Sequence, residues 1–182
     1  MEIQKIATRE GYGKALLELG RINKNVVVVD ADLGDSTKAE LFGKEFPERY
    51  FTMGIAEQDM IGAAAGLSVS GKIPYASTFA VFSERAFEFV RNIVARNKLN
   101  VKICGSHAGI TTGEDGKSAQ ALEDVAIYRS LPNMVVLQPC DAVEAEKMVF
   151  ALAEYNGPSY MRVHRTAYPV IHDKNYKFEM GK

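Results

Sequence analysis

Short apolar segments rich in β-branched residues recur along the chain, and segments with helical periodicity separate them. Six of these apolar segments are typical of strands, the last a weaker one: residues 25–32, 73–79, 100–107, 133–139, 158–164 and 49–54. Their nearly continuous hydrophobicity indicates strands covered on both faces, as in a parallel sheet. Helical patterns occupy residues 8–24, where Thr8 is the expected cap, 83–97 and 141–157. This alternation predicts a three-layer α/β/α fold around a doubly wound, mainly parallel sheet.

One further helix is marked by its small side chains. Residues 53–71 read MGIAEQDMIGAAAGLSVSG, in which Glu57 stands at the start of a helix built largely from Gly and Ala. We expect neighbouring backbone to approach this helix closely and to bury most of its length. An acid in the first turn interacts favourably with the helix dipole. A carboxylate held in a dry pocket could also exchange a proton with a ligand, so both roles are open for Glu57.

Composition excludes several classes of protein. The 182 residues are 47% hydrophobic and 25% charged, with a formal net charge of −1, which is typical of a globular domain and not of a nucleic-acid-binding protein. No apolar run approaches the roughly 18 residues that cross a membrane, and the charged start MEIQKIATRE lacks the apolar core of a signal peptide. Cys104 and Cys140 adjoin apolar segments and indicate buried thiols of a reducing compartment. We therefore expect a cytoplasmic protein without nucleic-acid or membrane partners.

The common nucleotide and metal motifs are missing from the sequence. No G-x-G-x-x-G follows a strand, no P-loop is present, and the three histidines lack metal-ligand spacing, so we expect no metal ligands in this chain. Residues 106–124, SHAGITTGEDGKSAQALED, instead form a long Gly-rich connection after a strand. Ligands of open α/β sheets bind beyond the carboxyl ends of the strands, and long ordered loops are usually functional. We expect this connection to border a site.

Six segments, taken in order, resemble the pyrimidine-binding domain of transketolase, a thiamine-diphosphate enzyme. They are TREGYGKAL, DADLGDS, MGIAEQDMIGAAAGLSVSG, STFAVFSERA, GSHAGITTGEDGKSAQALEDVAIYRSLPNMVV and QPCDAVEA. The resemblance runs from Ala7 to Val170 and implies the thiamine-diphosphate-binding fold. It implies that residues 1–171 form the pyrimidine-binding domain and that residues 172–182, which have no evident partner element, begin a linker to a further domain.

The resemblance also implies that this chain is one part of an assembly. In the family, a second domain grips the diphosphate through Mg²⁺ or Ca²⁺, using a G-D-G motif followed by Asn, and this sequence lacks that motif. The chain therefore resembles the C-terminal half of a split transketolase or an excised domain. A diphosphate-binding domain or subunit is the implied partner, within a homodimer or larger assembly, and the isolated chain is expected to be inactive.

Five residues match positions around the cofactor in that family. Glu57 matches the catalytic glutamate, whose carboxyl holds ring N1′ of the aminopyrimidine and promotes the imino tautomer that takes the thiazolium proton. This role calls for a pKa raised by desolvation. Phe79 and Phe82 match the aromatic pair that packs on the ring, although the apolar helix stripe leaves a plain core role open for Phe82. Asp32 and Leu33 match residues beside the cofactor.

Other residues match the sugar-binding positions of the family. His107 matches a histidine near the donor's carbonyl and hydroxyl oxygens, and Asp115 matches an aspartate that contacts a sugar hydroxyl, although either can be an ordinary loop residue. Two departures make the sugar and one pocket edge uncertain. Ala119 stands where the family usually has histidine, and Arg85 where it often has tyrosine.

Three residues of this chain match the positions that bind the phosphate of the sugar in the family. Arg9, Ser36 and Arg165 correspond to the family's phosphate ligands, and guanidinium groups suit this task because they bind phosphate bidentately. Arg162 is an alternative to Arg165 because the flanking sequence matches poorly.

The resemblance thus implies transfer of two-carbon ketol units between sugar phosphates once the chain is paired. Alternatives are the corresponding domain of a deoxyxylulose-phosphate synthase or of a keto-acid dehydrogenase β-type subunit, or a non-catalytic assembly module.

Overall fold

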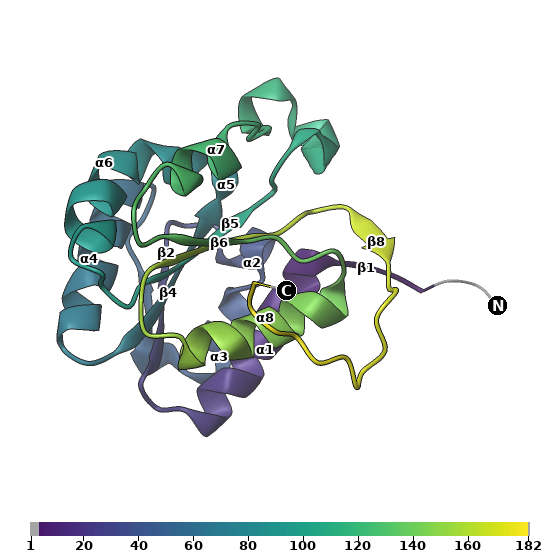
Figure 1. Ribbon diagram of the computed structural model, residues 1–182, viewed down its shortest axis with the longest axis horizontal. Coiled ribbons are helices and arrows are strands. Elements are labelled where there is room, and N and C mark those ends of the chain that lie inside the picture. Colours follow the sequence, from purple (N-terminus) through teal and green to yellow (C-terminus); the bar gives the residue numbers. More distant parts are fainter. Residues whose placement is uncertain (1–3, 182) are drawn as a thin grey trace.

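Six parallel strands form the central sheet of the protein, in the order β3-β2-β4-β5-β7-β6 (Figure 1). The structure is a computed structural model and describes residues 4–181. The strands are β2 (Val26–Asp30), β3 (Tyr50–Thr52), β4 (Ile73–Phe79), β5 (Lys102–Ser106), β6 (Val135–Leu137) and β7 (Ser159–Arg162). All six predicted strands are confirmed, and so is the parallel α/β fold.

Helices cover both faces of this sheet (Figure 1). On one face lie α1 (Thr8–Ile22), α3 (Glu40–Glu45) and α8 (Ala142–Glu154), and on the other α4 (Glu57–Val69), α6 (Phe87–Phe89) and α7 (Asp124–Arg129). The remaining helical segments are short: α2 (Gly34–Thr37), η1 (Pro47–Arg49), α5 (Ala80–Ser83), η2 (Glu84–Ala86), η3 (Val90–Ala95), η4 (Ile110–Asp115) and η5 (Lys117–Ala119). Among residues 4–181, no helix combines the length and apolar character that crossing a bilayer requires.

Neighbouring residues of the central strands point to opposite faces and build two separate cores. Tyr75 of β4 and Cys104 of β5 join the cluster under α1 and α8, whereas Ala76 and Ile103 join the cluster under α4 and η3. Both faces of each strand are therefore apolar, which explains the continuous hydrophobic runs in the sequence.

Close contact between α1 and α8 depends on a glycine. A Cβ built at Gly11 would lie 2.3 Å from the carbonyl oxygen of Ala142, the first residue of α8. A contact this short is a steric clash with backbone atoms, so the two helices must move apart if Gly11 gains a side chain.

We expect Gly11→Ala to lower the free energy of unfolding by about 2 kcal/mol, because overpacking outweighs the better helix propensity of alanine. Gly66→Ala in α4 is the matched control, since nothing lies within 4 Å of its Cβ position, and it should raise stability by up to about 1 kcal/mol. Urea unfolding of both variants measures the difference. Equal effects of the two substitutions would contradict the packing argument.

The predicted helix over residues 83–97 is interrupted. It begins at Ala80 and runs as α5, the 3₁₀ turn η2, α6 and the π-helical η3. The hydroxyl of Tyr128, in α7, donates to the Ser83 carbonyl oxygen at 3.1 Å, so this carbonyl has a partner outside the helix. The side chain of Asn97 donates to the carbonyl of Asn92 at 3.1 Å, which supports the wider turn at the end of η3.

The helix that begins at Glu57 is less covered than the sequence predicts. Met60, Ile61, Ala64 and Ala65 are buried, but Gly66 is exposed and Val69 is 74% exposed. One face of α4 therefore packs on the sheet. The other face includes two glycines, Gly62 and Gly66, and nothing lies within 4 Å of the Cβ position of either.

A small antiparallel ribbon joins the two ends of the described chain. It pairs β1 (Lys5–Ala7) with β8 (Ala167–Pro169), seen as the purple and yellow strands at the right of Figure 1. Thr8 follows β1 and does not cap α1 as predicted. Its hydroxyl oxygen accepts the backbone N–H of His164 at 2.7 Å instead, which ties the start of α1 to the segment before β8.

The segment after β8 also has partners, which corrects the expectation that residues 172–182 have none. Phe178 and Met180 pack against the hydrophobic cluster of α1 and α8. Tyr176 stacks on His172, with ring centroids 3.8 Å apart. That these residues begin a linker to a further domain stays a prediction.

Candidate active site

Three neighbouring strands end at one edge of the sheet, and sequence-predicted site residues follow each of them. Asp32 and Leu33 come after β2, Phe79 is the last residue of β4, and His107 comes directly after β5. Because β2, β4 and β5 are adjacent and parallel, their carboxyl ends lie side by side. This is the edge where open α/β sheets bind ligands.

A polar cavity of about 240 Å³ opens at this edge. Its lining residues are Arg9, Asp35, Ser36, Lys38, Phe79, His107, Asp115 and Arg165. Six of them are predicted from the sequence, and Asp35 and Lys38 are not. Asp35 precedes Ser36 in the short helix α2, and Lys38 follows the last residue of that helix with a φ of 70°, but neither position carries a sequence signal that points to a site.

Arg9 contacts residues from two separate segments that line the cavity. Its Nη1 donates to the carbonyl oxygen of Ser36 at 2.8 Å and lies 3.3 Å from Nε2 of His107. Its Nε is buried and has no hydrogen-bond partner among the described residues. Since a buried donor without a partner is costly, this nitrogen is well suited to bind an anionic ligand.

The contacts of His107 define its protonation state. A guanidinium group only donates hydrogen bonds, so Nε2 of His107 accepts from Arg9. The proton then sits on Nδ1, which lies 3.0 Å from the Ser106 hydroxyl. Burial lowers the pKa of His107 to about 4, and the charge of Arg9 acts in the same direction. The ring is thus neutral at pH 7, with its acceptor nitrogen at Arg9.

Arg165, and not Arg162, lines the cavity. Nη1 of Arg165 donates to the carbonyl oxygen of Thr112 at 3.1 Å and lies 3.8 Å from the Asp115 carboxylate. Arg162 instead donates from Nε to the fully buried Asp124 at 2.8 Å. The two arginines, left as alternatives by the sequence, therefore have different environments.

Glu57 is the first residue of α4 and is only 2% exposed. Nη1 of Arg85 lies 3.5 Å from its Oε2. The arginine that departs from the family pattern thus places a cation beside this carboxylate. The Arg85 side chain is itself 62% exposed, so this ion pair joins a buried carboxylate to a cation at the surface.

Three aromatic rings stack in a row at the carboxyl ends of β4 and β5. Phe79 lies between His107, at a centroid distance of 3.8 Å, and Phe82, at 5.5 Å with the planes 7° apart. Phe79 is buried, whereas Phe82 is half-buried and belongs to neither of the two main core clusters. This position argues against a plain core role for Phe82.

The other predicted cofactor residues lie outside the 240 Å³ cavity, as do Glu57 and Phe82. Asp32 is exposed in a left-handed conformation with a φ of 62°. Leu33 is half-buried, and its N–H donates to the buried Asp30 carboxylate at 3.1 Å. Asp30 thereby holds the turn that carries both residues.

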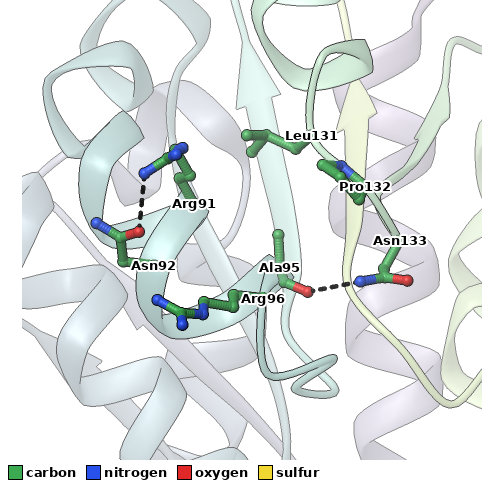
Figure 2. Close-up of a pocket in the computed structure, with 7 residues that line it drawn as sticks. All are labelled: Arg91, Asn92, Ala95, Arg96, Leu131, Pro132 and Asn133. Atoms are coloured by element: carbon green, nitrogen blue, oxygen red, sulfur yellow. Dashed lines mark hydrogen bonds between the residues drawn. The ribbon is translucent and has the colours of Figure 1, made fainter.

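A second cavity, of about 310 Å³, has no predicted site residue (Figure 2). It is lined by Arg91, Asn92, Ala95, Arg96, Leu131, Pro132 and Asn133. Since Arg96 precedes β5 and Asn133 precedes β6, this cavity lies at the amino ends of the strands, opposite the candidate site. Figure 2 shows the Asn133 side chain reaching the Ala95 carbonyl, a bond of 3.1 Å.

Two buried histidines make stability depend on pH. Burial lowers the pKa of His164 to about 4, as it does for His107. Between about pH 4 and 6.5 the unfolded chain binds protons that the folded chain does not, so each histidine makes the fold less stable as the pH falls through this window. Glu84 acts in the opposite direction, because burial raises its pKa to about 7.

We therefore expect the histidine contribution to appear as a difference between variants. The free energy of unfolding should fall on acidification from pH 7 to 4.5. In His107→Asn and in His164→Asn, this fall should be about 1–3 kcal/mol smaller than in the unsubstituted chain. Guanidinium unfolding at several pH values measures this. Parallel pH curves for all three proteins would show that the histidines titrate normally in the folded state.

Comparison with known proteins agrees with this geometry. Residues 4–170 match the family described as "Transketolase, pyrimidine binding domain". A protein of Methanocaldococcus jannaschii described as the C-terminal section of a transketolase is 52% identical over 177 residues, which are 96% of this chain and 56% of that protein. Human transketolase is 41% identical over 179 residues, covering 98% of this chain and 29% of the human protein.

Solved structures show the same relationship. A split-gene transketolase, solved as an inactive β4 tetramer, superposes with a TM-score of 0.88 at 53% identity and covers 98% of this chain and 58% of its own. Transketolase from Campylobacter jejuni gives a TM-score of 0.87 at 28% identity, over 97% of this chain and 28% of its own. The chain spans little more than half the length of the nearer relatives named above. It belongs to the transketolase family and corresponds to the pyrimidine-binding domain.

Proposed function

We propose that this chain is the pyrimidine-binding part of a split transketolase. Paired with a diphosphate-binding subunit, it transfers two-carbon ketol units from a ketose phosphate to an aldose phosphate. The observation that carries the proposal is the convergence of Arg9, Ser36, His107, Asp115 and Arg165 on one cavity beside the Phe79 ring.

The cofactor of this reaction is thiamine diphosphate, which supplies the nucleophilic carbon that takes up the ketol unit. Glu57 fits the task of holding a proton at the aminopyrimidine, because its carboxylate is 2% exposed at the start of α4. Phe79 and Phe82 fit the task of contacting an aromatic ring and excluding water, since their own rings are nearly parallel. The partner subunit provides the groups that hold the diphosphate and its Mg²⁺ or Ca²⁺.

The cavity has the charge and donors for a sugar phosphate. Arg9, Lys38 and Arg165 place three cations on its wall. Lys38 is 3.6 Å from Asp35, and Arg165 pairs with Glu114 and Asp115. Arg9 has no carboxylate partner among the described ion pairs, so it is the cation best placed for a phosphate. Nε2 of His107 accepts from Arg9 in the present arrangement, so a sugar hydroxyl that donates a hydrogen bond to this nitrogen must take the place of Arg9. Asp115 supplies a second acceptor for hydroxyl groups.

Exposed apolar side chains in and near α4 support the need for a partner. Ile55 and Val69 are each 74% exposed at the two ends of α4, and Phe51 in β3 is 36% exposed. Gly62 and Gly66 have open space at their Cβ positions, so another backbone can approach this face of the helix closely. We propose that the partner subunit or a second copy of this chain covers it within a homodimer or larger assembly.

The direct test is reconstitution. The chain is mixed with the diphosphate-binding subunit, thiamine diphosphate and Mg²⁺, and ketol transfer between a ketose phosphate and an aldose phosphate is measured. The pair should be active and either subunit alone inactive. Turnover of 2-keto acids in place of sugar phosphates would assign the chain to a keto-acid dehydrogenase, and a pair inactive on both substrate classes would leave only an assembly role.

A further inference from the structure

Three side chains capable of binding a metal ion converge away from the candidate active site. Cys140 and Asp141 lie between β6 and α8, and His172 lies 32 residues after Cys140 in the segment that follows β8. Nδ1 of His172 is 3.6 Å from Sγ of Cys140 and 3.2 Å from Oδ2 of Asp141. All three ligand atoms lie within 4.8 Å of one another.

The sulfur–nitrogen and nitrogen–oxygen separations match those of ligands that share one zinc ion. With Zn–S near 2.3 Å and Zn–N or Zn–O near 2.0–2.1 Å, a tetrahedral site sets sulfur and nitrogen about 3.6 Å apart and nitrogen and oxygen about 3.3 Å apart. Thiolate, imidazole and carboxylate are also the ligands that zinc takes in proteins.

We propose that Cys140, Asp141 and His172 form a binding site for Zn²⁺ or a similar divalent transition metal. The ion joins the segment after β8 to the start of α8, and its fourth position is open to water. Cys140 binds as the thiolate, and the thiol proton passes to solvent. This site is separate from the proposed active site, whose residues it does not include.

Backbone N–H groups fix the position of the Asp141 carboxylate. Its Oδ2 accepts the N–H groups of Ile171 and His172, both at 2.8 Å, and its Oδ1 accepts that of Glu144 at 2.8 Å. The side chain is fully buried. These bonds fix the orientation of the carboxylate. Because Oδ2 already accepts two N–H groups, the metal ion takes the place of one of these bonds when it binds.

The other two ligands are also oriented by neighbours. The His172 ring stacks on Tyr176, whose hydroxyl donates to Oε1 of Glu144 at 3.2 Å. The other oxygen of Glu144 accepts the backbone N–H of Cys140 at 2.8 Å. Cys140 is exposed, contrary to the sequence-based expectation, while Cys104 is buried as expected. The site is therefore open to an ion from solution.

A catalytic triad does not explain this arrangement. In a nucleophilic triad, one imidazole nitrogen faces the thiol and the other faces the carboxylate. Here the same nitrogen, Nδ1, faces both Cys140 and Asp141. One N–H cannot serve both groups well, whereas one metal ion can bind all three.

The test uses the full chain and the metals alone. Titration with Co²⁺ should produce a thiolate-to-cobalt charge-transfer band at one ion per chain, and saturating Zn²⁺ should raise the thermal midpoint by about 5 °C. Cys140→Ala and His172→Ala should lose both signals. Cys104→Ala should keep the band, and so should Tyr176→Phe, which removes a bond of the segment without removing a ligand.

The controls separate the possible outcomes. No charge-transfer band at excess Co²⁺ in the folded, unsubstituted chain would overturn the proposal. The same holds for a band that depends on Cys104, or for a Zn²⁺ shift that survives both ligand substitutions. Far-ultraviolet circular dichroism of each variant verifies that it is folded, so a lost band reports the ligand and not the fold.

Discussion

Glu57→Gln, assembled with the diphosphate-binding subunit, is expected to lower kcat for ketol transfer by about 10²–10⁴-fold. Glutamine keeps the size of the side chain and its place at the start of α4, but it cannot hold a proton that passes to and from a ligand nitrogen. The carboxylate is 2% exposed, so water does not replace it readily. Steady-state kinetics at saturating thiamine diphosphate measures the loss.

Asp59→Asn is the matched control for this substitution. Asp59 is another acid in the first turn of α4, and it is exposed. If Glu57 serves only the helix dipole, both variants should keep nearly full activity and lose similar, small amounts of stability. A loss of less than tenfold in Glu57→Gln, with an unchanged thermal midpoint, would reject the catalytic role.

Arg9→Met should raise KM for phosphorylated sugars by about 100-fold and change kcat much less. Methionine keeps an apolar stem, but it removes the donors that face the cavity, and each charge-assisted hydrogen bond is worth about 1.5–3 kcal/mol. Sugars without a phosphate should bind the variant and the unsubstituted enzyme alike. Initial rates with a phosphorylated and an unphosphorylated acceptor distinguish these effects.

Arg162→Met should give the opposite pattern. Its guanidinium is 2.8 Å from the fully buried Asp124, so removing it leaves a buried carboxylate with the Tyr160 hydroxyl but without its cationic partner. We expect this to lower the free energy of unfolding by about 3 kcal/mol. KM for the sugar phosphate should not change. A raised KM in Arg162→Met and an unaltered one in Arg9→Met would show that the phosphate binds elsewhere.

The parts of the fold that depend on local pattern could be predicted from sequence. The runs that became β2, β4 and β5 are mainly apolar because both faces are covered, and their carboxyl ends brought Phe79 and His107 together. The interrupted helix after Phe79 could not be predicted from local pattern, because the Ser83 carbonyl at its break bonds to Tyr128, and no local pattern connects two residues so far apart in the chain.

The same difference between local pattern and long-range contact applies to the candidate sites. Arg9, His107 and Arg165 were found through a family resemblance, since no spacing rule connects residues so far apart in sequence. Lys38 was missed because a lysine in a polar loop carries no signal of its own. His172 and Cys140 were missed for a related reason: the segment after β8 folds back on α8 through contacts that local sequence does not report.

The ribbon of β1 and β8 has a consequence for recognition. Ala7 pairs with Ala167. Arg9 follows Ala7 by two residues, in the first turn of α1, and Arg165 precedes Ala167 by two residues. Backbone pairing thus fixes how far apart the two arginines leave the main chain, whether or not a ligand is bound. A ligand that bridges them loses little entropy in ordering the protein, so its affinity should depend mainly on how well its own shape fits a preorganised pair of cations.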